Sequence, residues 1–484
     1  MIRLFTVSLF VVIILLVIFF SYKDSALSYK EAEEKLLSIG QVHLLKDWDN
    51  LNPKEQQEML LQIQNLDASV FLAQQDLIEH PLPGIKEPVN PLTNIAHSGN
   101  QEYISRGKQL IREGKAGCII VAGGQGSRLR SDQPKGMFDV TVIKHKSLFQ
   151  LFAEKTLAAS IQAGLPLQLA IMTSPGNHKD TVTYFKDNHY FHLNEDQISF
   201  FTQTELPFLD SNGNLFLERQ NKIAQGPNGN GGVLKHFFDS GIWSDWYQRG
   251  ISYIFFMFID NALADPFDAE LIGSNDIEKS DAAMKCIERI NPEEKLGVMV
   301  EKDGKIHVVE YSELFPELMV INDDGKLKYP CGHIGLYSFN MDFVKQIAMH
   351  YDEIPIHNTW KAVKYLNADN LTVMSAQPIA WKYEKLIFDI LPYAQKVNVI
   401  MSPRECCFGP LKNEKGPDSL SEVQKALQAR DKKIFEEISG TTPPDRPFEL
   451  SPQFYYPTLE MVEFWKGKKL PETHYIEPFL DKSS

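Results

Sequence analysis

The sequence predicts an α/β fold in which a mostly parallel sheet is covered by helices on both faces. Between residues 117 and 340, short apolar runs alternate with segments of helical periodicity, which is typical of strands joined by crossover helices. A glycine-rich turn directly follows the first of these runs, and sheets of this kind bind ligands beyond the carboxyl ends of their strands. Because the chain has 484 residues, we expect two or three domains.

The composition is that of a globular protein with a negative net charge. The chain is 43% hydrophobic and 23% charged, and its formal net charge is −14. No block of lysine and arginine stands out, so we expect no nucleic acid partner. The five cysteines show no C-x-x-C spacing, which indicates neither a disulfide framework nor a zinc site. The body of the protein therefore has the character of a cytosolic protein, and nothing in the sequence predicts an oligomeric state.

The amino terminus has a different character. Residues 4–20 are apolar except for Thr6 and Ser8, which is about the minimum length for a membrane span, and no small-x-small cleavage site follows them. One arginine precedes this run and three lysines follow it, an asymmetry that favours a cytosolic carboxyl-terminal side. We therefore expect residues 1–24 to be a membrane anchor with the body of the protein in the cytosol. The alternatives are a secretion signal and a wrongly assigned start codon.

The next region predicts a mainly helical amino-terminal domain over residues 28–114. Leucine and other apolar residues recur at three- and four-residue steps in residues 28–77, and residues 52–55 (Asn-Pro-Lys-Glu) are typical of a helix start. Residues 80–91 are rich in proline and predict an extended linker. A further helix is expected over residues 101–113.

A central α/β domain is predicted over residues 115–395, followed by a carboxyl-terminal domain over residues 396–484. The expected strands of the central domain are short apolar runs, at residues 118–121, 167–172, 198–201, 251–259, 297–300 and 306–310. The glycine turn, Asp260 and Glu310 each lie at the end of one of these strands. We therefore expect them to face one crevice. Beyond residues 441–447, which are rich in proline, we expect only a short tail.

The glycine turn after the first strand predicts binding of a nucleoside triphosphate. Gly123, Gly124 and Gly126 can adopt positive φ and leave no Cβ between the main chain and a ligand, so successive N–H groups can converge on phosphate oxygens. Arg128 and Lys135 follow and supply positive charge. The spacing is neither that of a P-loop nor that of a dinucleotide fold. Taken alone, such a cluster is also compatible with a plain tight turn.

A second glycine cluster, Gly-Pro-Asn-Gly-Asn-Gly-Gly, occupies residues 226–232 just before a helical run that begins at Val233. Flexible main chain at the start of a helix suits a flat or anionic ligand. A simple loop is the alternative interpretation.

Asp260 follows the most apolar predicted strand and is the candidate metal ligand. Mg²⁺ prefers oxygen ligands and is commonly shared between one or two carboxylates and a phosphorylated substrate. The alternative is that Asp260 caps the following helix. We favour the metal, because a carboxylate close to the phosphates of a bound triphosphate lies where their charge must be neutralised.

The pattern G-G-x-G-[ST]-R-L…P-K in residues 123–135 resembles the signature of the eukaryotic-type UDP-N-acetylhexosamine pyrophosphorylase family. Three further segments resemble the same family and occur in the same order, at residues 308–313, 382–389 and 410–413. Weaker similarity extends from about residue 29 to the carboxyl terminus. The resemblance implies a central Rossmann-like nucleotidyltransferase domain with a mixed, mostly parallel sheet, and smaller amino- and carboxyl-terminal domains.

The resemblance also implies a reaction and a set of site residues. UTP and N-acetylglucosamine 1-phosphate, a hexosamine 1-phosphate, would give UDP-N-acetylglucosamine and pyrophosphate, with Mg²⁺ as cofactor. The residues implied in catalysis are Arg128, Lys135 and Lys412. Those implied in nucleotide binding are Val121, Ala122, Gly123, Gly124, Lys135, Gln203, Gly229, Asp260 and Lys382. Those implied in sugar binding are Asn230, Glu310, Tyr311, His333 and Lys412, and the implied metal ligand is Asp260.

Two departures from the family pattern keep alternatives open. Arg130 stands where the family usually has glycine, and Gly332-His333 stands where it has Gly-Asn in a motif that contacts the N-acetylated sugar. A neutral imidazole can donate or accept one hydrogen bond toward the sugar, but it cannot copy both functions of an amide at once. A UDP-glucose or broad-specificity UDP-sugar pyrophosphorylase is therefore the first alternative. An inactive UDP-sugar-binding protein and a glycosyltransferase are the others.

Overall fold

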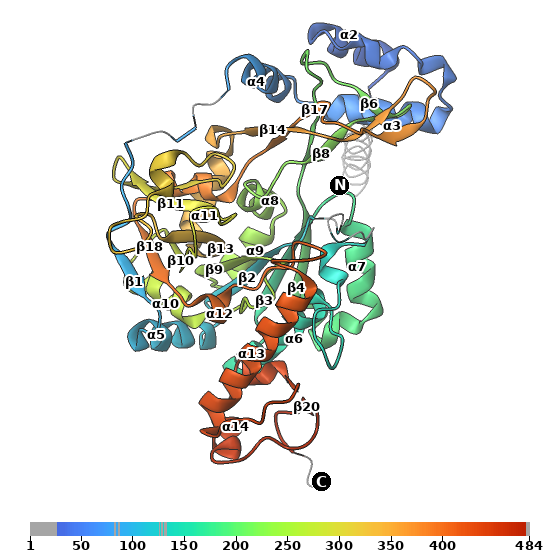
Figure 1. Ribbon diagram of the computed structural model, residues 1–484. Coiled ribbons are helices and arrows are strands. Elements are labelled where there is room, and N and C mark those ends of the chain that lie inside the picture. Colours follow the sequence, from blue (N-terminus) through green and yellow to red (C-terminus); the bar gives the residue numbers. More distant parts are fainter. Residues whose placement is uncertain are drawn as a thin grey trace, which may run out of the picture. The chain divides into compact units, whose positions relative to one another are not determined.

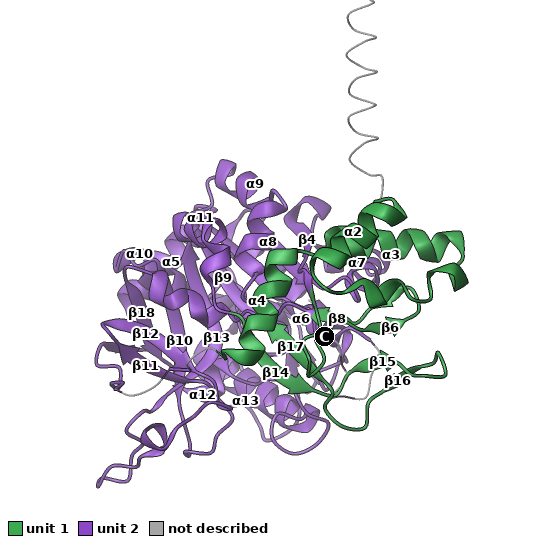
Figure 2. Ribbon diagram, turned by 90° about the horizontal axis from the view of Figure 1, so that it is seen from above, with its two compact units in different colours: residues 1–82, 206–226, 356–384 green, residues 83–205, 227–355, 385–484 purple. Residues whose placement is uncertain are grey.

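The computed structural model describes residues 27–81, 84–85, 88–124, 126, 129 and 133–480. The predicted anchor over residues 1–24, as well as Arg128 and Arg130, lies outside the described residues. The chain divides into two compact units (Figure 2). Unit 1 consists of residues 1–82, 206–226 and 356–384, and unit 2 of residues 83–205, 227–355 and 385–484. The domain boundaries at residues 114 and 395 stay a prediction.

Unit 2 is built around a ten-stranded sheet whose main path runs β1-β18-β10-β13-β9-β2-β3-β4. All neighbours on this path are parallel except for the two pairs made by β13, and β11 and β12 form an antiparallel extension beside β13. The predicted mixed, mostly parallel sheet is therefore confirmed. Its strands are β1 (Ile95–His97), β2 (Ala116–Val121), β3 (Gln168–Thr173), β4 (Ile198–Thr202), β9 (Tyr253–Phe258), β10 (Ala282–Glu288), β11 (Val298–Lys302), β12 (Lys305–Val309), β13 (Cys331–Asn340) and β18 (Val397–Met401).

The central strands are apolar because both of their faces are covered. Cys118 and Ile120 of β2 belong to one hydrophobic core, whereas Ile119 between them belongs to a second core on the opposite face. The first core includes side chains of α5 (Gln101–Arg112), α6 (Leu148–Ala163) and α10 (Ala269–Ile277). The second includes side chains of α8 (Val233–Asp239), α9 (Ile242–Gln248) and α11 (Met341–Met349). Figure 1 shows α5 and α10 side by side on one side of this sheet.

The close approach of α5 and α10 depends on glycine. A Cβ on Gly107 would lie 1.7 Å from the carbonyl oxygen of Ala269, and a Cβ on Gly273 would lie 1.9 Å from the carbonyl oxygen of Tyr103. Any larger residue would therefore force the two helix backbones apart.

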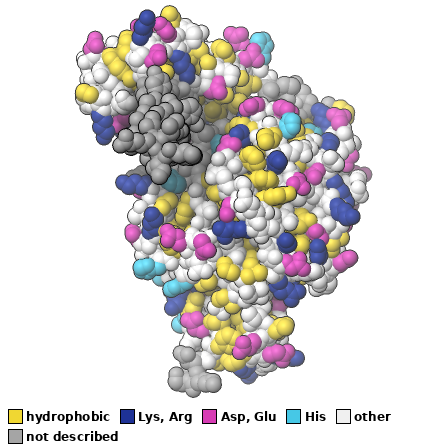
Figure 3. Space-filling view, turned by 180° about the vertical axis from the view of Figure 1, so that it is seen from behind, with side chains coloured by type: hydrophobic (Ala, Val, Ile, Leu, Met, Phe, Trp, Pro, Cys, Tyr) yellow, Lys and Arg dark blue, Asp and Glu magenta, His cyan; other side chains and the backbone are white. Residues whose placement is uncertain are grey.

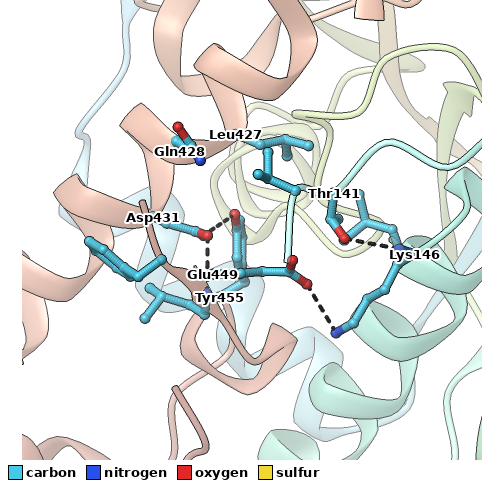
Figure 4. A pocket seen from close by; sticks show the side chains of 11 residues that line it. Thr141, Lys146, Leu427, Gln428, Asp431, Glu449 and Tyr455 are labelled. Atoms are coloured by element: carbon cyan, nitrogen blue, oxygen red, sulfur yellow. Dashed lines mark hydrogen bonds and ion pairs between the residues drawn. The ribbon is translucent and has the colours of Figure 1, made fainter. Parts of the chain in front are cut away.

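The carboxyl-terminal part of unit 2 is folded, so the prediction of only a short tail is wrong. α13 (Leu420–Ser439), α14 (Leu459–Trp465), β19 (Glu449–Leu450) and β20 (Tyr475–Ile476) surround a small core that contains Phe435 and Trp465. Nearby, Asp431 points toward Tyr455, and Lys146 points toward Glu449 (Figure 4). Further elements of this unit are α7 (His178–Asp187) and α12 (Arg404–Cys407), together with the 3-10 helices η4 (Lys135–Met137) and η9 (Ile387–Tyr393).

Unit 1 combines the predicted amino-terminal helices with two later β segments. The helices are α2 (Tyr29–Ser38), α3 (Pro53–Asn65) and α4 (Ala68–Glu79). The predicted start of α3 is confirmed, since Asn52 and Glu55 form a capping box and Pro53 occupies the first turn. The strands are β6 (Leu217–Arg219), β7 (Lys222–Ile223), β14 (His357–Lys361), β15 (Lys364–Leu366), β16 (Thr372–Met374) and β17 (Ala380–Glu384), and the short pair β5 (Glu205–Pro207) and β8 (Gln225–Pro227) borders this unit.

The described surface agrees with the composition. On the face in Figure 3, basic and acidic side chains are interspersed, and no large block of one sign covers the described residues. The five cysteines are free thiols, and Cys406 is the one that is not buried. Among the helices of the described residues, none combines the length and the hydropathy that a membrane span requires.

Candidate active site

A cavity of about 270 Å³ lies in unit 2 beyond the carboxyl end of β9. It brings together side chains that are far apart in the sequence, because the ends of several strands and loops meet there. The expectation that Asp260 and Glu310 face one crevice is confirmed. The predicted site residues that line it are Asn230, Asp260, Glu310, Tyr311, His333 and Lys412.

Lys135 connects the glycine loop to this cavity. Its Nζ lies 3.5 Å from Oδ2 of Asp260, and the two side chains are 17% and 21% exposed, so water screens the pair only in part. The backbone N–H of Lys135 donates to the carbonyl oxygen of Gly124 at 3.4 Å. Lys135, which is predicted to bind phosphate, therefore lies beside Asp260, which is predicted to bind the metal.

The glycine loop presents free main-chain donors. The N–H of Ala122 donates to Met172, and that of Gly126 donates to Gln133, whereas the N–H groups of Gly123 and Gly124 have no partner among the described residues. Two such successive N–H groups at the end of a parallel strand can donate to a phosphate oxygen. Val121, also a predicted nucleotide contact, is the last residue of β2.

The reason for glycine in this loop differs from the one expected. Gly123, Gly124 and Gly126 could adopt positive φ, but none of them has φ in the left-handed region. Space is the requirement at Gly123, where a Cβ would lie 2.1 Å from Nε2 of Gln203. The same holds at Gly126, where a Cβ would lie 2.8 Å from the ring of Phe138.

Gln203, a predicted nucleotide contact, therefore packs directly against the glycine loop. It follows β4, and its N–H donates to the carbonyl oxygen of Thr173 at 2.9 Å. Its side chain is buried, so its amide group is positioned by the surrounding strands rather than by water.

The second glycine cluster is held by the segment that follows β17. Gly229 has φ 79°, in the left-handed region. The carboxamide oxygen of Asn230 accepts from the N–H of Ile387 at 2.7 Å, and the N–H of Gly231 donates to the carbonyl oxygen of Lys385 at 2.8 Å. The Lys385 ammonium donates to the carbonyl oxygens of Tyr351 and Ile354, and burial lowers the pKa of Lys385 to about 8.

His333 and Lys412 form the basic side of the cavity. Burial, with a smaller effect from the charge of Lys412, lowers the pKa of His333 to about 3, so its imidazole is neutral at physiological pH. Nζ of Lys412 lies 5.5 Å from the ring centroid of Phe408, and the N–H of Lys412 donates to the carbonyl oxygen of Asp418. Lys412 is thus the permanent cation on this side.

Lys382 is not part of this group of side chains. It lies on β17 in unit 1, where its Nζ is 2.8 Å from Oε1 of Glu384. Its predicted phosphate contact stays a prediction, as does that of Arg128, which lies outside the described residues.

The donors present suit Mg²⁺ bound together with a substrate. Within the described part of the chain, no three histidine, cysteine, aspartate or glutamate side chains form a group that could hold a metal ion by themselves. Asp260 supplies one carboxylate at the cavity, and Mg²⁺ commonly takes one or two carboxylates and completes its shell with phosphate oxygens and water.

Three residues that shape the site escaped the sequence analysis. The side chain of Asn177 donates to the carbonyl oxygen of Ala122 and accepts from the N–H of Ser174, which fixes the start of the glycine loop. Asn261 bonds the main chain of Cys407 and Gly409 and so positions the segment before Lys412. Lys295 lines the cavity. Only Asn261 carried a usable signal, since it directly follows Asp260.

Comparison with known proteins identifies the class of this α/β fold and its cavity. The model of the UTP–glucose-1-phosphate uridylyltransferase family matches residues 86–414, and the chain belongs to this family. Within it, the chain is 32% identical over 407 residues to UDP-N-acetylglucosamine diphosphorylase 2 of Arabidopsis thaliana, which covers 79% of this chain and 80% of that protein.

Two solved structures share the fold. One, assigned as a UDP-N-acetylglucosamine pyrophosphorylase of Entamoeba histolytica, is 30% identical and has a TM-score of 0.74, covering 80% of this chain and all of that one. The other is the uridine diphosphate N-acetylglucosamine pyrophosphorylase of Trypanosoma brucei, with 23% identity, a TM-score of 0.78, and coverage of 93% of this chain and 98% of that one.

Proposed function

We propose that this protein is a uridylyltransferase that converts UTP and N-acetylglucosamine 1-phosphate into UDP-N-acetylglucosamine and pyrophosphate. The observation that carries this proposal is the pair of N–H groups at Gly123 and Gly124, which find no partner among the described residues and lie near Lys135 and the cavity beyond β9. The relatives named above are diphosphorylases and pyrophosphorylases of UDP-N-acetylglucosamine, which supports the same assignment.

In the proposed reaction, a phosphate oxygen of the sugar 1-phosphate attacks the α-phosphorus of UTP in line. The new bond joins that oxygen to the α-phosphorus, and the bond between the α-phosphorus and the bridging oxygen to the β-phosphate breaks. Pyrophosphate leaves with the electron pair. Because the attacking phosphate is already ionised, no general base is required, and the protein acts by positioning two anions and stabilising charge.

The residues divide this work by their positions. The N–H groups of Gly123 and Gly124, with Lys135 and Arg128, would bind the triphosphate, and Gln203 and Gly229 would bind the uridine. Lys412 would neutralise the sugar phosphate, while Asn230, Glu310, Tyr311 and His333 would contact the sugar. When bound, Mg²⁺ would neutralise phosphate charge, and Asp260 is the residue that would hold it.

The decisive experiment is a pyrophosphate-release assay with UTP and a panel of sugar 1-phosphates, using protein that lacks residues 1–24. We expect turnover with N-acetylglucosamine 1-phosphate. Faster turnover with glucose 1-phosphate would instead favour a UDP-glucose or broad-specificity enzyme. His333 and the match to the UTP–glucose-1-phosphate uridylyltransferase family support this alternative. No turnover with any sugar phosphate would refute the proposal and favour a binding protein.

We also propose that residues 4–20 tether the enzyme to a membrane with its catalytic body in the cytosol. The apolar run and the lysines that follow it support this arrangement. Protease treatment of sealed membrane vesicles that carry the full chain would test it. In vesicles whose cytosolic face is on the outside, the protease should digest the catalytic body. Protection of the catalytic body in such vesicles would contradict the proposed orientation.

A further inference from the structure

On the sugar side of the cavity, the half-buried His333 is paired with the buried Tyr337 on the same strand. His333 lines the cavity, whereas Tyr337 is fully buried behind it among apolar side chains such as Phe256 and Phe339. Nε2 of His333 and the hydroxyl group of Tyr337 are hydrogen-bonded. The direction of this hydrogen bond determines which chemical group the imidazole presents to a ligand.

The burial of Tyr337 decides the direction. Its hydroxyl group has no other hydrogen-bond partner among the described residues, so its proton must go to Nε2 of His333 or stay unpaired in the core. An unpaired buried donor costs roughly 1–3 kcal/mol. Nε2 is therefore the acceptor, and the single proton of the neutral imidazole is on Nδ1.

Nδ1 is open to the cavity. It makes no hydrogen bond within the described residues, and it is accessible rather than buried. A donor that is both unpaired and accessible can be satisfied only by water or a ligand. The nearby charge of Lys412 reinforces the positive character of this side of the cavity.

We propose that Tyr337 is a positioning residue that holds His333 as a neutral Nδ1–H donor, and that the site thereby selects sugar 1-phosphates with a neutral acceptor oxygen facing His333. This inference rests on the proposed function and deepens it. An acetamido carbonyl is a pure acceptor and matches the donor best. A hydroxyl oxygen can also accept, whereas an ammonium substituent would face a second donor and Lys412. The expected order is therefore N-acetylglucosamine, then glucose, then glucosamine 1-phosphate.

The first test reads the tautomer in the free protein. Proton–nitrogen correlation spectra of protein labelled with ¹⁵N-histidine distinguish the two tautomers, and the His333→Asn variant identifies the signal. We expect a neutral Nδ1–H imidazole in the wild type and a mixture of tautomers in Tyr337→Phe. A wild-type imidazole that is protonated on Nε2, or on both nitrogens, would overturn the inference whatever the activity.

The second test separates positioning from general stability. Tyr337→Phe should raise KM for N-acetylglucosamine 1-phosphate about fivefold, as expected for loss of one neutral hydrogen bond, with little change in kcat or in KM for UTP. The Tyr337→Phe variant should also show a smaller preference for N-acetylglucosamine 1-phosphate over glucosamine 1-phosphate. The reason is that Nδ1 of His333 could then accept a hydrogen bond from the ammonium group. Tyr253→Phe is the matched control, since its partly buried hydroxyl donates to Asp276 at the opposite end of β9.

The outcomes are distinguishable. Unchanged KM and selectivity in an active Tyr337→Phe enzyme would refute this inference and leave the proposed function intact. Equal loss of kcat and stability in both tyrosine variants would show a merely structural role and would also refute it. Absence of turnover with every sugar phosphate in the wild type would refute the proposed function. The nitrogen spectra would still show which ring nitrogen of His333 carries the proton, and so would still test the role of Tyr337.

Discussion

Nζ of Lys135 lies 3.5 Å from Oδ2 of Asp260, so the cation after the glycine loop and the carboxylate at the end of β9 form a partly buried ion pair. In the free protein each neutralises the other. In the proposed reaction, Lys135 would turn to phosphate and Asp260 would hold Mg²⁺, so that neither charge would be left unpaired. The pair therefore keeps both groups in place before the substrate arrives, which lowers the cost of organising them.

Replacing Lys135 tests its share of this arrangement. Lys135→Ala should lower kcat roughly 100-fold or more, because a charge aimed at the developing phosphate charge is lost from a water-poor site. Pyrophosphate release measures the rate, and thermal unfolding checks that the fold is intact. Lys235→Ala is the matched control, since Lys235 forms an ion pair with Asp239 on the surface of α8. Near-normal turnover by Lys135→Ala would contradict the assignment.

Replacing Asp260 tests the metal site. Asp260→Asn should raise the Mg²⁺ concentration needed for half-maximal rate by about tenfold or more, because the amide keeps an oxygen but loses the negative charge. The measurement is a Mg²⁺ titration of the initial rate at saturating UTP. Asp239→Asn serves as the surface control. If the titration curves of Asp260→Asn and the wild type coincide, Asp260 does not bind the metal.

Gly123 tests the contact between the glycine loop and Gln203. A Cβ at position 123 would lie 2.1 Å from Nε2 of Gln203 and would displace that flexible side chain. Gly123→Ala should therefore raise KM for UTP about tenfold and weaken the preference for UTP over CTP, with a small effect on stability. Gly84→Ala is a suitable control, since a Cβ there would contact nothing within 4 Å. An unchanged preference for UTP over CTP in Gly123→Ala would mean that Gln203 does not discriminate between the two bases.

Asp431 predicts a pH dependence of stability. It is buried on α13, where it accepts from the N–H of Leu450 and the hydroxyl of Tyr455, and burial raises its pKa from 3.8 to about 7 (Figure 4). Between these two values the folded protein binds more protons than the unfolded chain. The free energy of unfolding should therefore fall as pH rises from about 4 to 7, by a few kcal/mol from this residue, with the loss complete above pH 7.

Urea unfolding at pH 5 and pH 8 measures this effect. The difference between the two free energies of unfolding should shrink in Asp431→Asn, which cannot ionise. Asp445→Asn is the control, because Asp445 is exposed and pairs with Lys432 on the surface. An equal pH difference in the wild type and Asp431→Asn would show that Asp431 does not titrate in this range.

Local sequence determined the elements that hold the site's main chain. Apolar runs predicted β2, β3, β4 and β9, because strands that are covered on both faces, as β2, β3 and β9 are, must be apolar along most of their length. Glycine and polar residues then lie beyond the strand ends, as Gly123 does after β2 and Asp260 after β9. The position of Asp260 at a cavity followed from the same argument. The capping box at Asn52 was predictable because it depends on residues three positions apart.

Contacts between distant segments were decided only by the tertiary structure. β13 escaped prediction because histidine, glycine and serine interrupt its apolar pattern, and its antiparallel place between β10 and β9 depends on partners about 50 and 80 residues away. The space limit at Gly123 exists only because Gln203 arrives from another strand. The hydrogen bond between Tyr337 and His333 could not be anticipated either, since both residues had to be placed in the sheet before they could be seen to be neighbours. Sequence therefore determines local backbone preference and the pattern of burial, whereas the polarity of the cavity arises from side chains that only the folded sheet brings together.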